Sequence, residues 1–299
     1  MRTKTRFFAN AALASAITLG LASQAVAQQD WDAINEETLR HFRALLQFDT
    51  SDPPGRELPA AEYIRDVLEA EGFEVEMLAN NDERPNVVTR LKGNGSKEPL
   101  LIMAHTDTVN VDPAKWTFPP FSATVDGGYV YGRGAVDDKD NLAAGLMVML
   151  ELKRQGIKLD RDVIFLAESG EEGATEFGIE FMINEHFDKI ESEFCLAEGG
   201  SVARVNREVQ YAGIQSVEKI PYQINLTATG VAGHGSVPLQ TNPVVRLAKA
   251  MAAVADWPSP IRLNETTAAY FERLAGISPP DGASSNHAMG LAFQMVRSG

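Results

Sequence analysis

The sequence predicts an α/β protein with a mostly parallel sheet and helices on both faces. Short apolar runs at 100–104, 163–167 and 194–197 are typical of buried strands. Longer segments with helical spacing of apolar residues lie between and around them. Strands that alternate with helices of this length favour parallel pairing, because a parallel connection needs a crossover that a helix supplies.

The individual elements follow from local signals. A first helix is expected over 30–48, ended by a Pro-Pro-Gly turn, and a second over 58–71, closed by Gly72 as a C-cap. Between the strands expected over 100–104 and 163–167, residues 142–152 are apolar enough for a helix that packs on the sheet. The expected strands, in order, are 73–78, 86–91, 100–104, 163–167 and 194–197.

The pattern changes from about residue 214. Residues 219–229 alternate between apolar and polar, which predicts a half-solvated antiparallel strand, and a helix is expected over 243–257. We therefore predict a second, α+β domain over 215–299, after a first domain over 28–214.

Residues 1–27 are predicted to be a secretory signal peptide. Arg2, Lys4 and Arg6 precede a short apolar stretch that ends in an Ala-x-Ala cleavage site at 25–27. A membrane anchor is the alternative, but this stretch is short and interrupted by polar residues. The mature chain is then expected from Gln28, in the periplasm or outside the cell, with no membrane association after cleavage.

The charge excludes some partners. Loss of three basic residues with the signal peptide takes the formal net charge from −14 to −17. So acidic a chain is a poor partner for nucleic acid or an anionic membrane. Cys195 is the sole cysteine, so no internal disulfide can form, and its place in a strand predicts a buried, inert thiol.

Four potential metal ligands follow predicted strands or their turns. They are His105, Asp137, Glu172 and Glu198. Imidazole and carboxylate donors suit zinc or another divalent first-row metal, and four are too many for one catalytic zinc with an open position. Two ions about 3.5–4 Å apart would use them all. Each acid alone could instead be a helix cap or turn residue, but four such strand ends together favour a metal site.

Two further acids suit supporting roles. Glu171 and Glu172 are adjacent on a turn, so one can bind metal while the other acts as a general base. Asp107, two residues after His105, could orient the imidazole.

The chain resembles the dinuclear-zinc amidohydrolases that include glutamate carboxypeptidases, aminoacylases and succinyl-diaminopimelate desuccinylases. The matching motifs are Met-Ala-His105-Thr-Asp107, Gly-Arg-Gly-Ala-Val-Asp137-Asp-Lys139, Glu171-Glu172-Gly173, Ala-Glu198-Gly and Gly230-x3-His234-x-Ser-x-Pro238.

The resemblance implies a zinc exopeptidase-like fold and a role for each of these residues. His105 would bind one of two Zn²⁺ ions, Asp137 would bridge them, and Glu172 and Glu198 would complete one site each; Co²⁺ or Mn²⁺ could substitute. Asp107 would orient His105, and Glu171 would generate a metal-bound hydroxide. The second domain would be an inserted lid that forms a homodimer. His234 on it would reach the partner's site and hold the oxyanion.

The resemblance also implies a fifth ligand, a histidine after the lid. The chain ends at Gly299, and His287 lacks the motif context to replace that ligand. We therefore expect this sequence to be a truncated form that is inactive or poorly folded alone. His41, His186 and His287 match no motif and are expected at the surface.

The expected activity is zinc-dependent hydrolysis of a terminal peptide bond or of the amide bond of an N-acyl amino acid. One alternative is a non-peptidase amidohydrolase or deacylase on the same site. Another is a non-catalytic peptide-binding module, which would have no need of a base such as Glu171.

Overall fold

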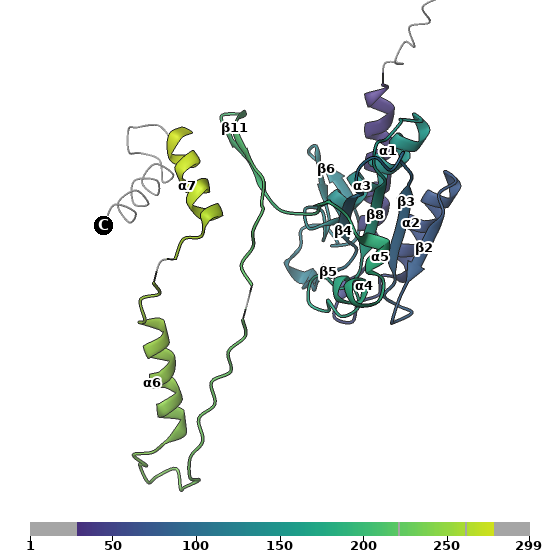
Figure 1. The fold of residues 1–299 in the computed structure, drawn as a ribbon. Helices are drawn as coiled ribbons and strands as arrows, with labels where there is room; N and C mark the ends of the chain where they lie inside the picture. The colour runs from purple at the N-terminus through teal and green to yellow at the C-terminus, as the bar shows by residue number, and fades with distance from the viewer. Residues whose placement is uncertain (1–28, 221, 261, 278–299) are drawn as a thin grey trace, which may run out of the picture. The chain divides into compact units, whose positions relative to one another are not determined.

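The computed structural model describes residues 29–220, 222–260 and 262–277. The chain divides into two compact units, one up to Glu198 and one from Gly199, and each is described by itself (Figure 1). The domain boundary at 214 stays a prediction. Within the described ranges, no helix combines the length and the apolar character needed to span a membrane.

A five-stranded mixed sheet forms the centre of the first unit (Figure 1). Its strands lie in the order β2-β3-β8-β4-β9. Strand β4 pairs in parallel with β8 and β9, whereas β3 pairs antiparallel with β2 and β8. The bounds are β2 Val75–Leu78, β3 Asn86–Leu91, β4 Leu100–His105, β8 Val163–Glu168 and β9 Phe194–Leu196. The α/β class is confirmed, and the three parallel strands are those predicted to deliver metal ligands.

Helices cover both faces of this sheet because successive side chains of a strand point to opposite sides. In β8, Phe165 packs into a core with the helices α1, α2 and α3, whereas Leu166 packs into a second core with α4 and α5. Both side chains are fully buried. The helices are α1 Trp31–Leu46, α2 Leu58–Ala70, α3 Lys139–Arg154, α4 Ile179–Glu185 and α5 Phe187–Ile190.

Short elements complete the two units. In the first unit they are β1 Ser51–Asp52, which pairs with β5 Thr108–Val109, the 3₁₀ helix η1 Pro113–Lys115, and the hairpin of β6 Thr124–Asp126 and β7 Tyr129–Tyr131. The second unit contains the antiparallel pair β10 Ser201–Val205 and β11 Glu208–Gly213, and the helices α6 Pro243–Ala255 and α7 Glu265–Ile277. Helix α6 confirms the helix expected over 243–257.

Two predictions of local structure are wrong. The described residues of 219–229 contain no strand, because alternation marks two faces but a strand also needs a partner for its backbone hydrogen bonds, and none pairs with this segment in the described part of the chain. Cys195 is exposed rather than buried, since β9 lies at an edge of the sheet.

The histidines outside the motifs also differ from expectation. His41 is buried, and its Nδ1 lies 2.7 Å from the Tyr63 hydroxyl. His41 lies one helical turn before the buried Leu45, so the helical spacing of the sequence already indicated that it is on the buried face. His186 is partly buried, with its ring 4.9 Å from that of Phe181. His287 lies outside the described residues.

Candidate metal centre

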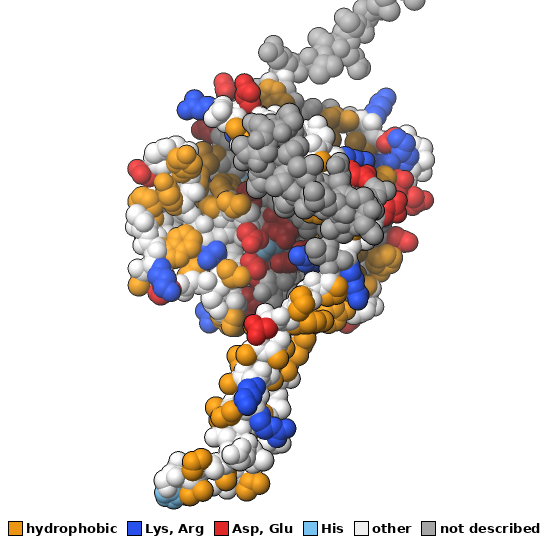
Figure 2. All heavy atoms as spheres, turned by 90° about the vertical axis from the view of Figure 1, so that its left-hand side faces the viewer, with side chains coloured by type: hydrophobic (Ala, Val, Ile, Leu, Met, Phe, Trp, Pro, Cys, Tyr) orange, Lys and Arg blue, Asp and Glu red, His pale blue; other side chains and the backbone are white. Residues whose placement is uncertain are grey.

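The parallel strands bring a histidine and several acids to one edge of the sheet. His105 is the last residue of β4, Glu198 follows β9, and Glu171 lies in the turn after β8. Because the carboxyl ends of parallel strands meet at one edge, these side chains start from neighbouring positions. On one face of the molecule, acidic side chains gather round a histidine (Figure 2). Strand topology therefore assembles most of the group.

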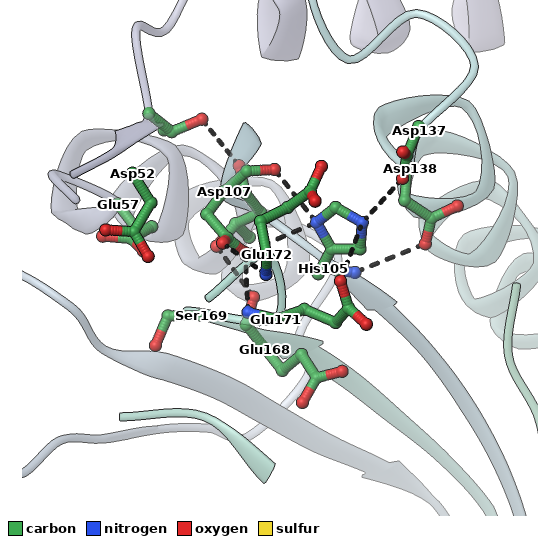
Figure 3. Close-up of polar contacts among 12 residues, drawn as sticks. Asp52, Glu57, His105, Asp107, Asp137, Asp138, Glu168, Ser169, Glu171 and Glu172 are labelled. Carbon is green, nitrogen blue, oxygen red and sulfur yellow. Dashed lines mark hydrogen bonds and ion pairs between the residues drawn. The ribbon is translucent and has the colours of Figure 1, made fainter. Parts of the chain in front are cut away.

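The imidazole of His105 lies at the centre of this group (Figure 3). Its Nε2 atom is 3.0 Å from Oδ1 of Asp137, 3.6 Å from Oε2 of Glu198 and 4.0 Å from Oε2 of Glu171. His105, Asp137 and Glu198 each offer a ligand atom within 4.8 Å of the other two. The fold thus brings together three of the four predicted metal ligands, with the predicted base beside them.

Asp107 holds both the imidazole and the turn opposite it. Nδ1 of His105 lies 2.9 Å from the carbonyl oxygen of Asp107 and 3.4 Å from its carboxylate. Both are acceptors, so Nδ1 donates a hydrogen, and Nε2 is the nitrogen that faces the acids. The Asp107 carboxylate also accepts the backbone N–H groups of Glu171 and Glu172, at 3.1 and 3.0 Å. This is the geometry that an orienting residue requires.

The charges of the group favour a cation. Burial raises the pKa values of Glu171, Glu172 and Glu198, and neighbouring carboxylates raise them further. Burial acts to lower the pKa of His105, but the hydrogen bonds and charges of Asp107 and then Asp137 outweigh it and raise that pKa to about 10. A proton and a metal ion compete for the same Nε2 lone pair.

The structure does not bring two predicted residues into the group. Glu172 is anchored through its backbone, but its carboxylate is not among the three that cluster. His234 lies in the second unit, where it is exposed and its Nδ1 is 2.7 Å from the Ser236 hydroxyl. The roles of Glu172 and His234 stay predictions.

Two buried acids beside the group were missed in the sequence. Asp138 accepts a hydrogen bond from the backbone N–H of His105 at 3.4 Å, and burial raises its pKa to about 6. Glu168 lies opposite His105 in the register of the parallel strands β4 and β8. Its Oε2 atom has no hydrogen-bond partner among the described residues, and burial raises the pKa of its carboxyl group to about 8. Asp138 is adjacent to a predicted ligand and Glu168 to a predicted strand end, and this position was the sequence signal that could have identified them.

The residues present fit a divalent metal. Three carboxylates face one imidazole nitrogen, and in the described part of the chain none of them forms an ion pair with lysine or arginine. A nitrogen and several carboxylate oxygens form a donor set that suits zinc. A cation there would relieve the mutual repulsion that raises the carboxylate pKa values.

Comparison with known proteins identifies the family. Residues 101–286 match Peptidase family M20/M25/M40. The chain belongs to this family. It is 39% identical over 145 residues to N-formyl-4-amino-5-aminomethyl-2-methylpyrimidine deformylase of Halalkalibacterium halodurans, covering 47% of this chain and 34% of that protein. It is 30% identical over 206 residues to a probable succinyl-diaminopimelate desuccinylase of Staphylococcus aureus, covering 68% of this chain and 47% of that protein.

Part of the chain is also similar to a solved structure. The M20 family metallo-carboxypeptidase Sso-CP2 from Sulfolobus solfataricus is 28% identical, with a TM-score of 0.49, and the match covers 56% of this chain and 38% of that one. The chain thus spans between a third and a half of the length of these relatives. The resemblance deduced from the motifs is confirmed, and the predicted enzyme class, a metal-dependent hydrolase, is that of the M20 family.

Proposed function

We propose that this M20 protein is a zinc-dependent hydrolase that cleaves a terminal peptide bond or the amide bond of an N-acyl amino acid. The observation that carries the proposal is the position of His105 Nε2, which faces carboxylates of Asp137, Glu198 and Glu171 from three separate turns. Zinc is favoured among divalent metals by the donor set, and two ions are proposed because four candidate ligands are too many for one catalytic zinc with an open position.

In this proposal, His105 and Glu198 would hold one ion, Glu172 would hold the other, and Asp137 would contribute to both sites. When bound, the metal would polarise the scissile carbonyl and stabilise its developing negative charge. Glu171 would take a proton from the attacking water and return it to the leaving amine. Asp107 supports this division of roles, because it accepts both backbone N–H groups of the Glu171–Glu172 pair.

The second unit is proposed to be a lid and dimerisation domain that contributes His234 to the oxyanion site of a partner subunit. The support is the glycine-rich motif around His234, in which the ring is exposed. Sedimentation of the protein at several concentrations measures its oligomeric state, and an assay of the same samples measures their activity. A monomer with full activity would contradict this part of the proposal.

A deacylase is the second candidate, because the similar proteins named above include a deformylase and a desuccinylase. Such an enzyme would use the same residues on a different acyl group. A peptide-binding module is the third, and Glu171 argues against it, since binding needs no base beside the metal.

The decisive experiment compares the full-length protein, which would include the histidine ligand expected after the lid, with its Glu171→Gln variant. Metal content is measured by elemental analysis, and hydrolysis is measured on a panel of dipeptides and N-acyl amino acids. We expect about two zinc ions in both proteins and a turnover at least ~10²-fold lower in the variant, because the base is lost and the ligands are kept. Wild type that binds metal but hydrolyses neither substrate class would favour the binding module.

Export is proposed from residues 1–27, which lie outside the described residues. The combination of basic residues, an apolar stretch and an Ala-x-Ala site supports it. Cell fractionation with N-terminal sequencing tests it: a mature chain that begins at Gln28 in the periplasm or medium is expected, and a cytoplasmic chain that keeps residues 1–27 would contradict it.

A further inference from the structure

A buried lysine lies directly after Asp137 and Asp138. Lys139 is the first residue of α3, and it is 0% exposed. Lysine is almost never fully buried unless its ammonium group is paired. Its Nζ donates to the carbonyl oxygens of Leu45 and Phe48, at 3.1 and 2.9 Å. The proposed function gives this residue no role.

The two acceptors lie at the carboxyl end of α1. Leu45 lies in the last turn of α1, where its carbonyl also accepts the backbone N–H of Phe48 at 3.3 Å, and Phe48 lies two residues beyond the helix. The carboxyl end of a helix carries a partial negative charge. A lysine that donates at this end adds hydrogen bonds there and is attracted by the helix dipole. Lys139 therefore joins the turn before α3 to a helix far away in the sequence.

The turn itself is built around the Lys139 side chain. Gly134 has a φ of +82°, and a Cβ on it would lie 3.1 Å from Cδ of Lys139 and 2.9 Å from Cγ2 of Thr108. The backbone N–H of Lys139 donates to the carbonyl of Gly134 at 3.0 Å. The turn from Gly134 to Lys139 thus packs closely against the side chain of the buried lysine.

Asp137 is followed by two buried residues. On its carboxyl side, Asp138 is 1% exposed and accepts from the backbone of His105, and Lys139 follows. The Asp137 side chain is 63% exposed, yet its Oδ1 is 3.0 Å from Nε2 of His105. An exposed side chain has little packing of its own to fix it, so its place beside His105 depends on the backbone that carries it.

We propose that Lys139 is a positioning residue for Asp137: by bonding to the end of α1, it fixes the turn that holds this carboxylate at the metal site. The inference rests on the proposed function, since it assumes that Asp137 is a metal ligand. It predicts an effect on metal affinity that a helix cap with a purely structural role would not have.

The chain provides a matched control at the other end of α3. The Nζ of Lys153 donates to the carbonyl of Gly72, just beyond the end of α2, and lies 4.2 Å from the centre of the Phe73 ring. Lys153 therefore makes the same kind of contact, from the same helix to the end of another helix, away from the metal site.

The experiment measures Co²⁺ binding to the metal-free full-length protein and to its Lys139→Met and Lys153→Met variants by the visible absorption of the bound ion. Unfolding in urea is followed for all three proteins without metal. We expect Lys139→Met to bind Co²⁺ at least about tenfold more weakly, with an altered absorption spectrum. Lys153→Met should keep the affinity and spectrum of wild type, even if its unfolding midpoint falls.

Each other outcome overturns the inference. A folded Lys139→Met with the affinity and spectrum of wild type would limit Lys139 to a structural role. If Lys139→Met does not fold, Lys139→Gln replaces it, with the same expected loss because its shorter side chain cannot reach both carbonyls. Failure of both to fold would assign Lys139 to fold stability alone. Wild type that binds no Co²⁺ would instead refute the metal centre, and this inference with it.

Discussion

The two turns that carry the acidic residues of the site are held in different ways. The turn with Glu171 and Glu172 is held from outside: Asp107, just beyond β4, accepts two of its backbone N–H groups. The turn with Asp137 is followed by its own anchor, Lys139, which bonds to the end of α1. One turn thus depends on the strand that carries His105, whereas the other depends on a helix that supplies no predicted ligand. A destabilising substitution in α1 should therefore disturb the site only through the turn that carries Asp137.

The largest effect is expected from Asp107→Asn, which weakens the first turn. An amide in this fully buried position must direct N–H hydrogens at the backbone N–H groups of Glu171 or Glu172, so donors face donors. We expect a loss of about 3 kcal/mol in the free energy of unfolding and at least tenfold weaker metal binding. Urea unfolding and a zinc titration measure the two effects.

Asp162→Asn is the matched control for that change. Asp162 also accepts a backbone N–H, that of Gly93 at 2.8 Å, and it pairs with Arg90 and Lys92 away from the site. The variant should lose stability but bind zinc as wild type does. Equal zinc affinities for the Asp107 and Asp162 variants would show that Asp107 does not position the site.

A smaller effect is expected when the glycine that precedes each set of acids, Gly170 or Gly134, is replaced by alanine. Gly170 and Gly134 have φ values of +72° and +82°. A Cβ on Gly170 would lie 2.4 Å from the carbonyl oxygen of Ala174, which is backbone, whereas the nearest contact of a Cβ on Gly134 is a side-chain atom at 2.9 Å, Cγ2 of Thr108. Gly170→Ala should therefore cost about 3 kcal/mol of stability and Gly134→Ala about 2 kcal/mol.

Gly95→Ala is the reference for these two substitutions, because Gly95 has a φ of +71° and nothing within 4 Å of the added Cβ. It should cost about 1 kcal/mol, from backbone strain alone. Urea unfolding of all three variants ranks them. A cost for Gly134→Ala above that of Gly170→Ala would mean that the Asp137 turn is the more rigid one.

The smallest effect concerns α1, the helix that anchors the Asp137 turn. Burial first, and then the charge of Arg40, hold the pKa of His41 below its usual value despite the opposing charge of Glu37. The unfolded chain then binds a proton more readily, so stability is full above about pH 6.5 and falls as the pH drops below it. The loss is at most about 1.4 kcal/mol per pH unit.

His41→Gln should remove this part of the pH dependence. The free energy of unfolding is measured between pH 7.5 and 5.0 for both proteins. The variant should lose less stability than wild type across that range. Parallel curves would show that His41 has the same pKa in the folded and unfolded states.

Much of the fold and of the candidate site could be predicted from the local pattern of apolar and polar residues along the sequence. Strand β3 begins and ends at the residues predicted, 86–91, and His105, Asp137 and Glu198 come together as their positions after strands or their turns suggested. Such predictions succeed because an apolar run of strand length has one stable environment, the interior of a sheet, and because parallel strands end at one edge.

Only the tertiary structure decided how those residues are held. Nothing local marks Lys139 as buried, since its acceptors on α1 lie far away in the sequence. The same holds for the exposed Cys195, whose strand lies at a sheet edge, and for 219–229, whose alternation has no partner strand among the described residues. The sequence by itself determined the family and the chemical groups of the site. Their burial and their anchors depend on which distant segments pack together, because hydrogen bonds and exclusion of water are properties of neighbours in space.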